Sequence, residues 1–134
     1  LLLEWDSLQQ IMNVASAGFG RFLHYDAARD QLNIFKIGGI ALGMVPSNQL
    51  RVGRDICKLA INDVLVLGTD GVIDMTNALG QRLGMDRWQK IVANRIHTGT
   101  AEQIFEAISQ DLLAFAGTAR QIDDITLMII RTVC

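Results

Sequence analysis

Two separate aspartate motifs contain the residues whose types and spacing could support metal binding or catalysis. Asp70 lies in Thr69-Asp70-Gly71, directly after the apolar run 64–67. A carboxylate beside so apolar a run must be hydrogen-bonded, paired with a base or bound to a cation, because an unpaired buried charge is costly. Gly71 leaves space beside the carboxylate for a ligand or for metal-bound water. The alternative is that Asp70 caps the turn after a strand, as aspartate often does.

The second motif is the pair Asp123 and Asp124, which precedes the apolar segment 125–130. If the pair opens a strand, its side chains point to opposite faces, so they are not expected to chelate one ion together. One can enter a site while the other caps the strand or reaches a second ion; a solvated strand entrance is the alternative. Oxygen ligands favour Mg²⁺ or Mn²⁺ over zinc, and two such ions can promote displacement at phosphorus. The residues alone indicate a divalent-metal hydrolase and leave its substrate open.

The other ionisable residues are weaker candidates. His24 and His97 each stand alone in the sequence, and Asp74 is expected to be a neighbour of the metal site or an ordinary solvated carboxylate. Cys57 is expected to be a small buried residue rather than a nucleophile, because no histidine is near it. Cys57 and Cys134 form neither a CxxC motif nor a Cys/His cluster, so the sequence supports neither zinc nor a disulfide framework.

Composition narrows the class of protein. The chain has 134 residues, half of them apolar, which fits one domain with a real core. Its 12 basic residues are scattered and its net charge is −2, so nucleic acid is not an expected partner. Apolar runs are too short for a membrane span, and the cysteine usage suits the cytoplasm. Because the sequence starts without Met inside an apparent strand, residues 1–134 are interpreted as a single partial domain; a processed N-terminus is the alternative.

The pattern of apolar residues predicts an α+β fold. Short apolar stretches separated by turn formers predict antiparallel strands, at 1–5, 11–15, 22–25, 32–37, 50–59, 64–67 and 125–130. Apolar residues at helical spacing predict helices over 88–96 and 101–115, the second with a Thr100/Gln103 capping box and an end at Gly117. The close spacing of Gly38, Gly39 and Gly43 predicts positive φ or a close backbone approach. The helix pair is expected to cover one face of the antiparallel sheet layers.

Taken together, residues 38–131 resemble the C-terminal half of the bacterial metal-dependent serine/threonine phosphatase domain (PPM, or protein phosphatase 2C). The similar branch contains stage II sporulation protein E and the sigma-factor-regulator phosphatases. The resemblance rests on segments that occur in family order: 38–43 resembles GGxPLG, 62–72 resembles GDxLxLYTDGV, Asn77, Gly80 and Gly84 fit NxxGxxxG, and 121–127 resembles xxDDxTL.

The resemblance implies an αββα sandwich and a dinuclear Mn²⁺ or Mg²⁺ centre with Asp70 and Asp123 as ligands, and Asp124 as a lesser candidate. Water activated by the metals would attack phosphoserine or phosphothreonine directly, without a phosphoenzyme. The implied partner is a phosphorylated regulatory protein such as an anti-sigma-factor antagonist. Two departures stand out: Phe19 replaces the histidine of an NAGH-like strand, and the GDxSGHG metal segment is absent.

The sequence leads to four further expectations, about activity, function class, fold and association. The chain by itself should be inactive, with phosphatase activity belonging to a longer protein. The alternative is a non-catalytic PPM-fold module used for regulation or protein interaction. A receiver or haloacid-dehalogenase-type domain is disfavoured, because those folds alternate strands and helices around a parallel sheet. A half-sandwich should also expose an apolar face, so the chain is expected to form a homodimer or larger oligomer.

Overall fold

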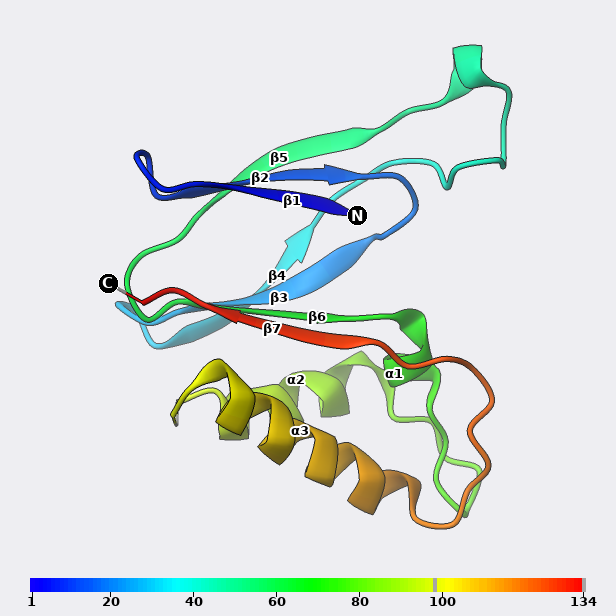
Figure 1. The fold of residues 1–134 in the computed structure, drawn as a ribbon. Helices are drawn as coiled ribbons and strands as arrows, with labels where there is room; N and C mark the ends of the chain where they lie inside the picture. Colours follow the sequence, from blue (N-terminus) through cyan, green and yellow to red (C-terminus); the bar gives the residue numbers. More distant parts are fainter. Residues whose placement is uncertain (98, 134) are drawn as a thin grey trace.

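The computed structural model describes residues 1–97 and 99–133, arranged in three layers (Figure 1). The first layer is an antiparallel sheet of order β1-β2-β5, here called sheet A, and the second is an antiparallel sheet of order β4-β3-β6-β7, here called sheet B. Helices α2 (Gly84–Arg95) and α3 (Ala101–Ala116) form the third layer, against sheet B. The α+β fold with a helix pair on one sheet face is thereby confirmed. The strands are β1 (Leu2–Asp6), β2 (Ile11–Ser16), β3 (Arg21–Asp26), β4 (Gln31–Lys36), β5 (Gly53–Lys58), β6 (Val64–Gly68) and β7 (Leu127–Arg131).

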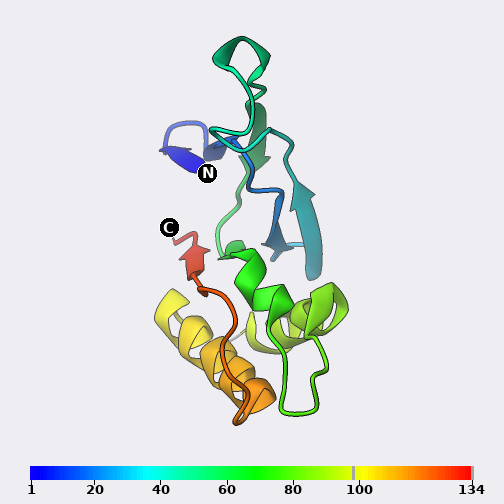
Figure 2. The same ribbon diagram turned by 90° about the vertical axis from the view of Figure 1, so that its right-hand side faces the viewer.

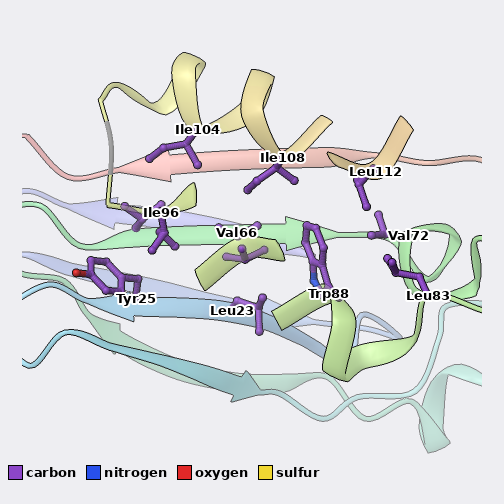
Figure 3. Close-up of a cluster of buried hydrophobic side chains, with 12 residues drawn as sticks. Leu23, Tyr25, Val66, Val72, Leu83, Trp88, Ile96, Ile104, Ile108 and Leu112 are labelled. Carbon is purple, nitrogen blue, oxygen red and sulfur yellow. The ribbon is translucent and has the colours of Figure 1, made fainter. Parts of the chain in front are cut away.

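The space between sheet B and the helices holds the larger apolar core, shown in Figure 3. Val64 and Val66 of β6 are fully buried, as expected for a strand covered on both sides. Helix α3 contributes one apolar stripe to this core, formed by Ile104, Ile108 and Leu112, which extend toward sheet B. Burial of these side chains fixes the position of β6, and therefore of the residues that follow it.

The second core lies between the two sheets. Alternation along β2 directs Met12 and Val14 inward, where they meet Leu65 and Leu67 of β6. Phe22 and Phe35 stack here with ring centroids 4.7 Å apart. β6 therefore contributes alternate side chains to both cores.

Helix α3 begins and ends where its sequence predicts, whereas α2 begins at Gly84, before the predicted start at residue 88. Helix α3 (Ala101–Ala116) has the expected capping box: Gln103 N donates to Thr100 Oγ1 at 3.3 Å, and Thr100 N donates to Gln103 Oε1 at 2.9 Å. Gly117 follows with a φ of +56°. Helix α2 (Gly84–Arg95) is the second member of the pair, and α1 (Asp70–Asp74) is a single turn directly after β6. No helix in the described part of the chain is long and apolar enough to cross a lipid bilayer.

Residues 38–52 form a projecting loop that contains a short 3-10 helix, η1 (Ser47–Gln49). Gly39 has a φ of +119°, and a Cβ there would lie 2.2 Å from the carbonyl oxygen of Ser16. Both expectations for the glycine cluster, positive φ and close backbone approach, are met at this one position. The loop is thereby held against the β2–β3 turn.

Strands β1 and β7 are edge strands on the same side of the molecule, and both chain ends lie there (Figure 2). Between them is a groove of about 470 Å³ with a mainly apolar lining. Trp5 and Met128 line it and are 42% and 51% exposed. By contrast, the outer face of sheet A carries Leu2 and Ile56 among polar side chains. The exposed apolar surface on this side of the molecule therefore lies in a groove between the two sheets.

We expect the 134-residue chain to associate with itself, because exposed apolar grooves beside unpaired strand edges promote association. Light scattering at high micromolar concentration should give a mass above that of the 14.8 kDa monomer. Met128→Ser should shift the equilibrium toward monomer, whereas Leu8→Ser, at a 96% exposed position in the β1–β2 turn, should not. A chain that remains monomeric at all concentrations would contradict the prediction.

Candidate functional site

Asp70 begins α1, two residues after the end of β6. Its side chain is exposed, so the argument that burial forces it to find a partner does not hold. Thr69 is the residue before the helix, and no side-chain hydrogen bond caps α1. Within residues 1–97 and 99–133, no hydrogen bond or ion pair involves the Asp70 carboxylate. The capping role is therefore not observed, and the carboxylate is free to face a ligand.

Thr69 joins the Asp70 turn to the second aspartate motif. Its backbone N donates to Thr126 O at 3.1 Å. Its hydroxyl donates to Asp124 O at 3.2 Å and accepts from Thr126 N at 3.0 Å. Two segments more than fifty residues apart are thus held side by side through one threonine.

Gly71 makes the same contact from the other side of Asp70. A Cβ on Gly71 would lie 2.3 Å from the carbonyl oxygen of Asp124. That is well inside van der Waals contact, so a side chain cannot be accommodated without moving the Asp124 backbone. The sequence interpretation, that Gly71 leaves space for a ligand, is therefore wrong in part: the Asp124 carbonyl fills that space.

Gly71→Ala is accordingly expected to displace the 123–126 segment and to lower the free energy of unfolding by about 1–3 kcal/mol. Urea denaturation measures this directly. Gly38→Ala is the matched control, because a Cβ there meets no atom within 4 Å. Equal unfolding midpoints for the two variants would show that the contact is not a constraint.

Asp123 and Asp124 differ in placement from the expectation. The last strand begins at Leu127, so both aspartates lie in the irregular segment before it and strand alternation does not apply to them. Asp124 N donates to Asp123 Oδ1 at 2.8 Å, and both side chains are exposed. Asp123 lines a cavity with Gly71 and Asp74, whereas Asp70 lines a different one. The backbones of the two motifs meet, but their carboxylates do not share a cavity.

The Asp70 cavity has a volume of about 240 Å³. Its apolar wall includes Met85 and Trp88 of α2 and Ile73 of α1, and the β2–β3 turn provides another wall. Arg21, the first residue of β3, also lines this cavity and is exposed. The cavity therefore presents an acid and a base above an apolar surface.

The two histidines lie away from Asp70. His24 Nε2 is 3.0 Å from Asp63 Oδ2, and His97 Nδ1 is 3.0 Å from the Tyr25 hydroxyl. Asp63 directly precedes β6, whereas Asp70 follows it, so the length of the strand separates this network from the candidate site. Neither histidine is placed to act at Asp70.

Asp74 and Cys57 have structural explanations. Asp74 forms an ion pair with Arg82 across the turn between α1 and α2, so it is an engaged carboxylate. Cys57 is 2% exposed in the core between the sheets, which agrees with the prediction of a buried apolar role. Burial raises the pKa of its thiol to about 11, so the reactive thiolate is scarce at neutral pH. Cys134 lies outside the described residues.

The side chains of these aspartates are of the type that binds a hard cation, but too few of them lie close together to hold one. Asp70, Asp123 and Asp124 are exposed oxygen donors without basic partners in the described structure, which suits Mg²⁺ or Mn²⁺. Among residues 1–97 and 99–133, however, no group of three or more acidic, histidine or cysteine side chains is close enough to hold a metal ion. The described residues therefore do not form a complete metal site by themselves.

Sequence reasoning missed two site residues. It treated Thr69 only as part of a motif, although Thr69 makes three hydrogen bonds that join the two segments. It did not single out Arg21, whose position opposite the end of β6 depends on the pairing of β3 with β6. The pairing register was the missing information, because no local pattern specifies which distant strand lies alongside.

The family model and the solved structures point to the same fold. The sequence model for stage II sporulation protein E (SpoIIE) matches residues 1–133. No curated protein matches the chain by sequence. Among solved structures, the SiaA-PP2C domain of Pseudomonas aeruginosa has a TM-score of 0.74 at 21% identity, covering 96% of this chain and 49% of that one.

Two further structures have the same fold. The phosphatase domain of the cell fate determinant SpoIIE from Bacillus subtilis, presoaked with Mn, has a TM-score of 0.71 at 15% identity, covering 98% of this chain and 55% of that one. The structure of the RsbU and RsbW domains of Rv1364c from Mycobacterium tuberculosis has a TM-score of 0.74 at 18% identity. The match covers 98% of this chain and 35% of that one. The chain spans about half the length of the first two of these domains.

Proposed function

This chain belongs to the stage II sporulation protein E family, and on that premise we propose that it forms part of a metal-dependent protein serine/threonine phosphatase domain. Its fold is that of PP2C-type phosphatase domains. The observation that supports the proposal most directly is the junction at Thr69. Its bonds to Asp124 and Thr126 hold the turn of Asp70 against the segment of Asp123 and Asp124.

In this proposal Asp70 and Asp123 are the metal ligands of the chain, with Asp124 as a lesser candidate. Mn²⁺ or Mg²⁺ ions, when bound, would supply an activated water and stabilise the charge that develops at phosphorus. Thr69 keeps the two aspartate segments at a fixed separation. Gly71 permits their close approach, because only a residue without a Cβ fits against the Asp124 carbonyl.

The remaining metal ligands are proposed to lie outside these 134 residues. The chain spans about half of the matched phosphatase domains, and its own carboxylates do not form a group of three in the described part. We therefore propose that residues 1–134 are a partial domain, inactive alone, and that the longer protein containing them is the enzyme. The proposed substrate is a phosphorylated regulatory protein in the cytoplasm, with an anti-sigma-factor antagonist as the first candidate.

The test is hydrolysis of a phosphoserine peptide and of para-nitrophenyl phosphate by the full-length protein. Activity should require Mn²⁺ or Mg²⁺ and disappear on chelation with EDTA, whereas residues 1–134 alone should show no turnover. Full-length protein that hydrolyses neither substrate at any Mn²⁺ concentration would contradict the proposal.

A non-catalytic PPM-fold module is the second candidate, supported by the incomplete ligand set and by Phe19 in place of histidine. Such a module would bind a protein partner without metal-dependent turnover. A GDxSGHG-like segment in the full-length sequence favours the enzyme, and its absence favours the module. The sequence of the complete protein therefore separates the two candidates before any assay.

A further inference from the structure

The cavity beside Asp70 contains a cation that no internal contact explains. Arg21 is exposed at the start of β3 and lines this cavity together with Asp70. No hydrogen bond or ion pair of the Arg21 guanidinium occurs in the part of the chain that the structure describes. Elsewhere in the fold, surface arginines such as Arg29 and Arg82 do pair with carboxylates.

Strand pairing places Arg21 at the end of sheet B where β6 delivers the chain to Asp70. Leu23 pairs with Val66 and Tyr25 with Val64, and Arg21 lies just beyond the last of these pairs, where it lines the same cavity as Gly68. Alternation gives Arg21 the same sheet face as Leu23 and Tyr25, which is the face toward α2. The guanidinium is thus carried by the strand next to the one that ends at the candidate site.

A second cation lies directly beside it. Arg21 pairs with Lys36 across β3 and β4, and both side chains are exposed. Two like charges directly opposite on antiparallel strands repel each other, and no carboxylate in the described residues pairs with either. A bound anion would relieve this repulsion.

The size and surroundings of the cavity indicate which kind of anion it would bind. Its volume of about 240 Å³ is below the range usual for drug-sized ligands, so it suits a small group. Guanidinium groups bind phosphate oxygens with two parallel hydrogen bonds, and binding is stronger beside apolar walls such as those of Met85 and Trp88. An arginine with a lysine beside it is a suitable donor set for a dianion.

We propose that Arg21, with electrostatic support from Lys36, binds the phosphoryl group of the phosphorylated serine or threonine side chain. This inference rests on the proposed phosphatase function and assigns the residue that holds the substrate phosphate in the Asp70 cavity. Arg21 is a binding residue: it orients the phosphoryl group and lowers the repulsion between that group and Asp70.

The experiment uses the full-length protein and the variants Arg21→Gln, Arg21→Lys and Arg54→Gln. Arg54 is the matched control, an exposed arginine on β5 that does not line the Asp70 cavity. Two quantities are measured: the KM and kcat for a phosphoserine peptide, and the affinity for inorganic phosphate, by calorimetry in EDTA. The second measurement needs neither metal nor turnover.

Arg21→Gln is expected to raise the KM and weaken phosphate binding by about tenfold each, because a charge-assisted bidentate contact is lost. The unfolding midpoint should not change, since the side chain is exposed. Arg21→Lys should recover part of the affinity through its charge but not all of it. Arg54→Gln should behave like the wild-type protein.

The outcomes separate the inference from the function on which it rests. Turnover with an unchanged KM and phosphate affinity in Arg21→Gln would overturn the inference and leave the phosphatase proposal intact. Phosphate binding that depends on Arg21 in a protein without turnover would support the inference and count against catalysis. Wild-type protein that binds no phosphate would overturn the inference in either case.

Discussion

Asp70→Asn in the full-length protein is expected to reduce metal-dependent phosphatase turnover by about 100-fold or more, and Asp123→Asn should do the same. An asparagine keeps the size of the side chain but removes the negative charge that offsets a divalent cation. Because both carboxylates are exposed and form no hydrogen bond or ion pair with another side chain among residues 1–97 and 99–133, the unfolding midpoints should barely change. Loss of activity would then report on metal binding rather than on folding.

Calorimetric titration with Mn²⁺ provides the second readout, and both variants should bind the ion more weakly. Asp124→Asn should have a smaller effect, since Asp124 contacts the Asp70 turn through its backbone carbonyl. Glu106→Gln, at an exposed position on α3, is the control for loss of one surface charge. If Asp70→Asn and Asp123→Asn both kept full activity, the metal assignment would be wrong.

Asp63→Ala is expected to lower the free energy of unfolding by about 3 kcal/mol. Asp63 is 3% exposed, and its carboxylate accepts three hydrogen bonds: from Ala27 N at 2.9 Å, Ala60 N at 3.0 Å and His24 Nε2 at 3.0 Å. Its own backbone carbonyl accepts from Thr132 N at 3.0 Å. Removal of the buried carboxylate leaves three part-buried donors without this acceptor, which is more costly than the loss of a surface pair.

Urea denaturation followed by circular dichroism measures this effect. Asp63→Asn should fall between the wild-type protein and Asp63→Ala, because its amide oxygen can still accept from a backbone N–H. The control is Asp55→Ala, an exposed aspartate on β5, whose midpoint should stay close to that of the wild-type protein. A stability for Asp63→Ala equal to that of the control would show that the network contributes little.

Local sequence patterns predicted most of the elements. The four strands before residue 38, the buried strand at 64–67 and the capping box at Thr100 lie at or within a residue or two of their predicted positions. Each of these is determined by apolar periodicity or by a short hydrogen-bonding motif. The last strand was predicted two residues too early: Ile125 and Thr126 have β-forming side chains, but the backbone of Thr126 bonds to Thr69 in the Asp70 turn instead.

The candidate site, like the fold, was predicted from the sequence only in part. The sequence by itself determined which carboxylates are candidates, because Asp70 follows an apolar run and Asp123 and Asp124 precede one. It also determined that a glycine follows Asp70. The exposure of these carboxylates and the separate cavities of Asp70 and Asp123 were decided by the tertiary structure.

Only the tertiary structure placed Thr69 between the two motifs and Arg21 in the Asp70 cavity. The physical reason is that both relations depend on pairing between strands far apart in sequence. β6 pairs with β3 on one side and β7 on the other, and that register follows from burial of its side chains in two cores at once. Local residue patterns specify a strand and its buried side chains, whereas packing of the whole chain selects its neighbours.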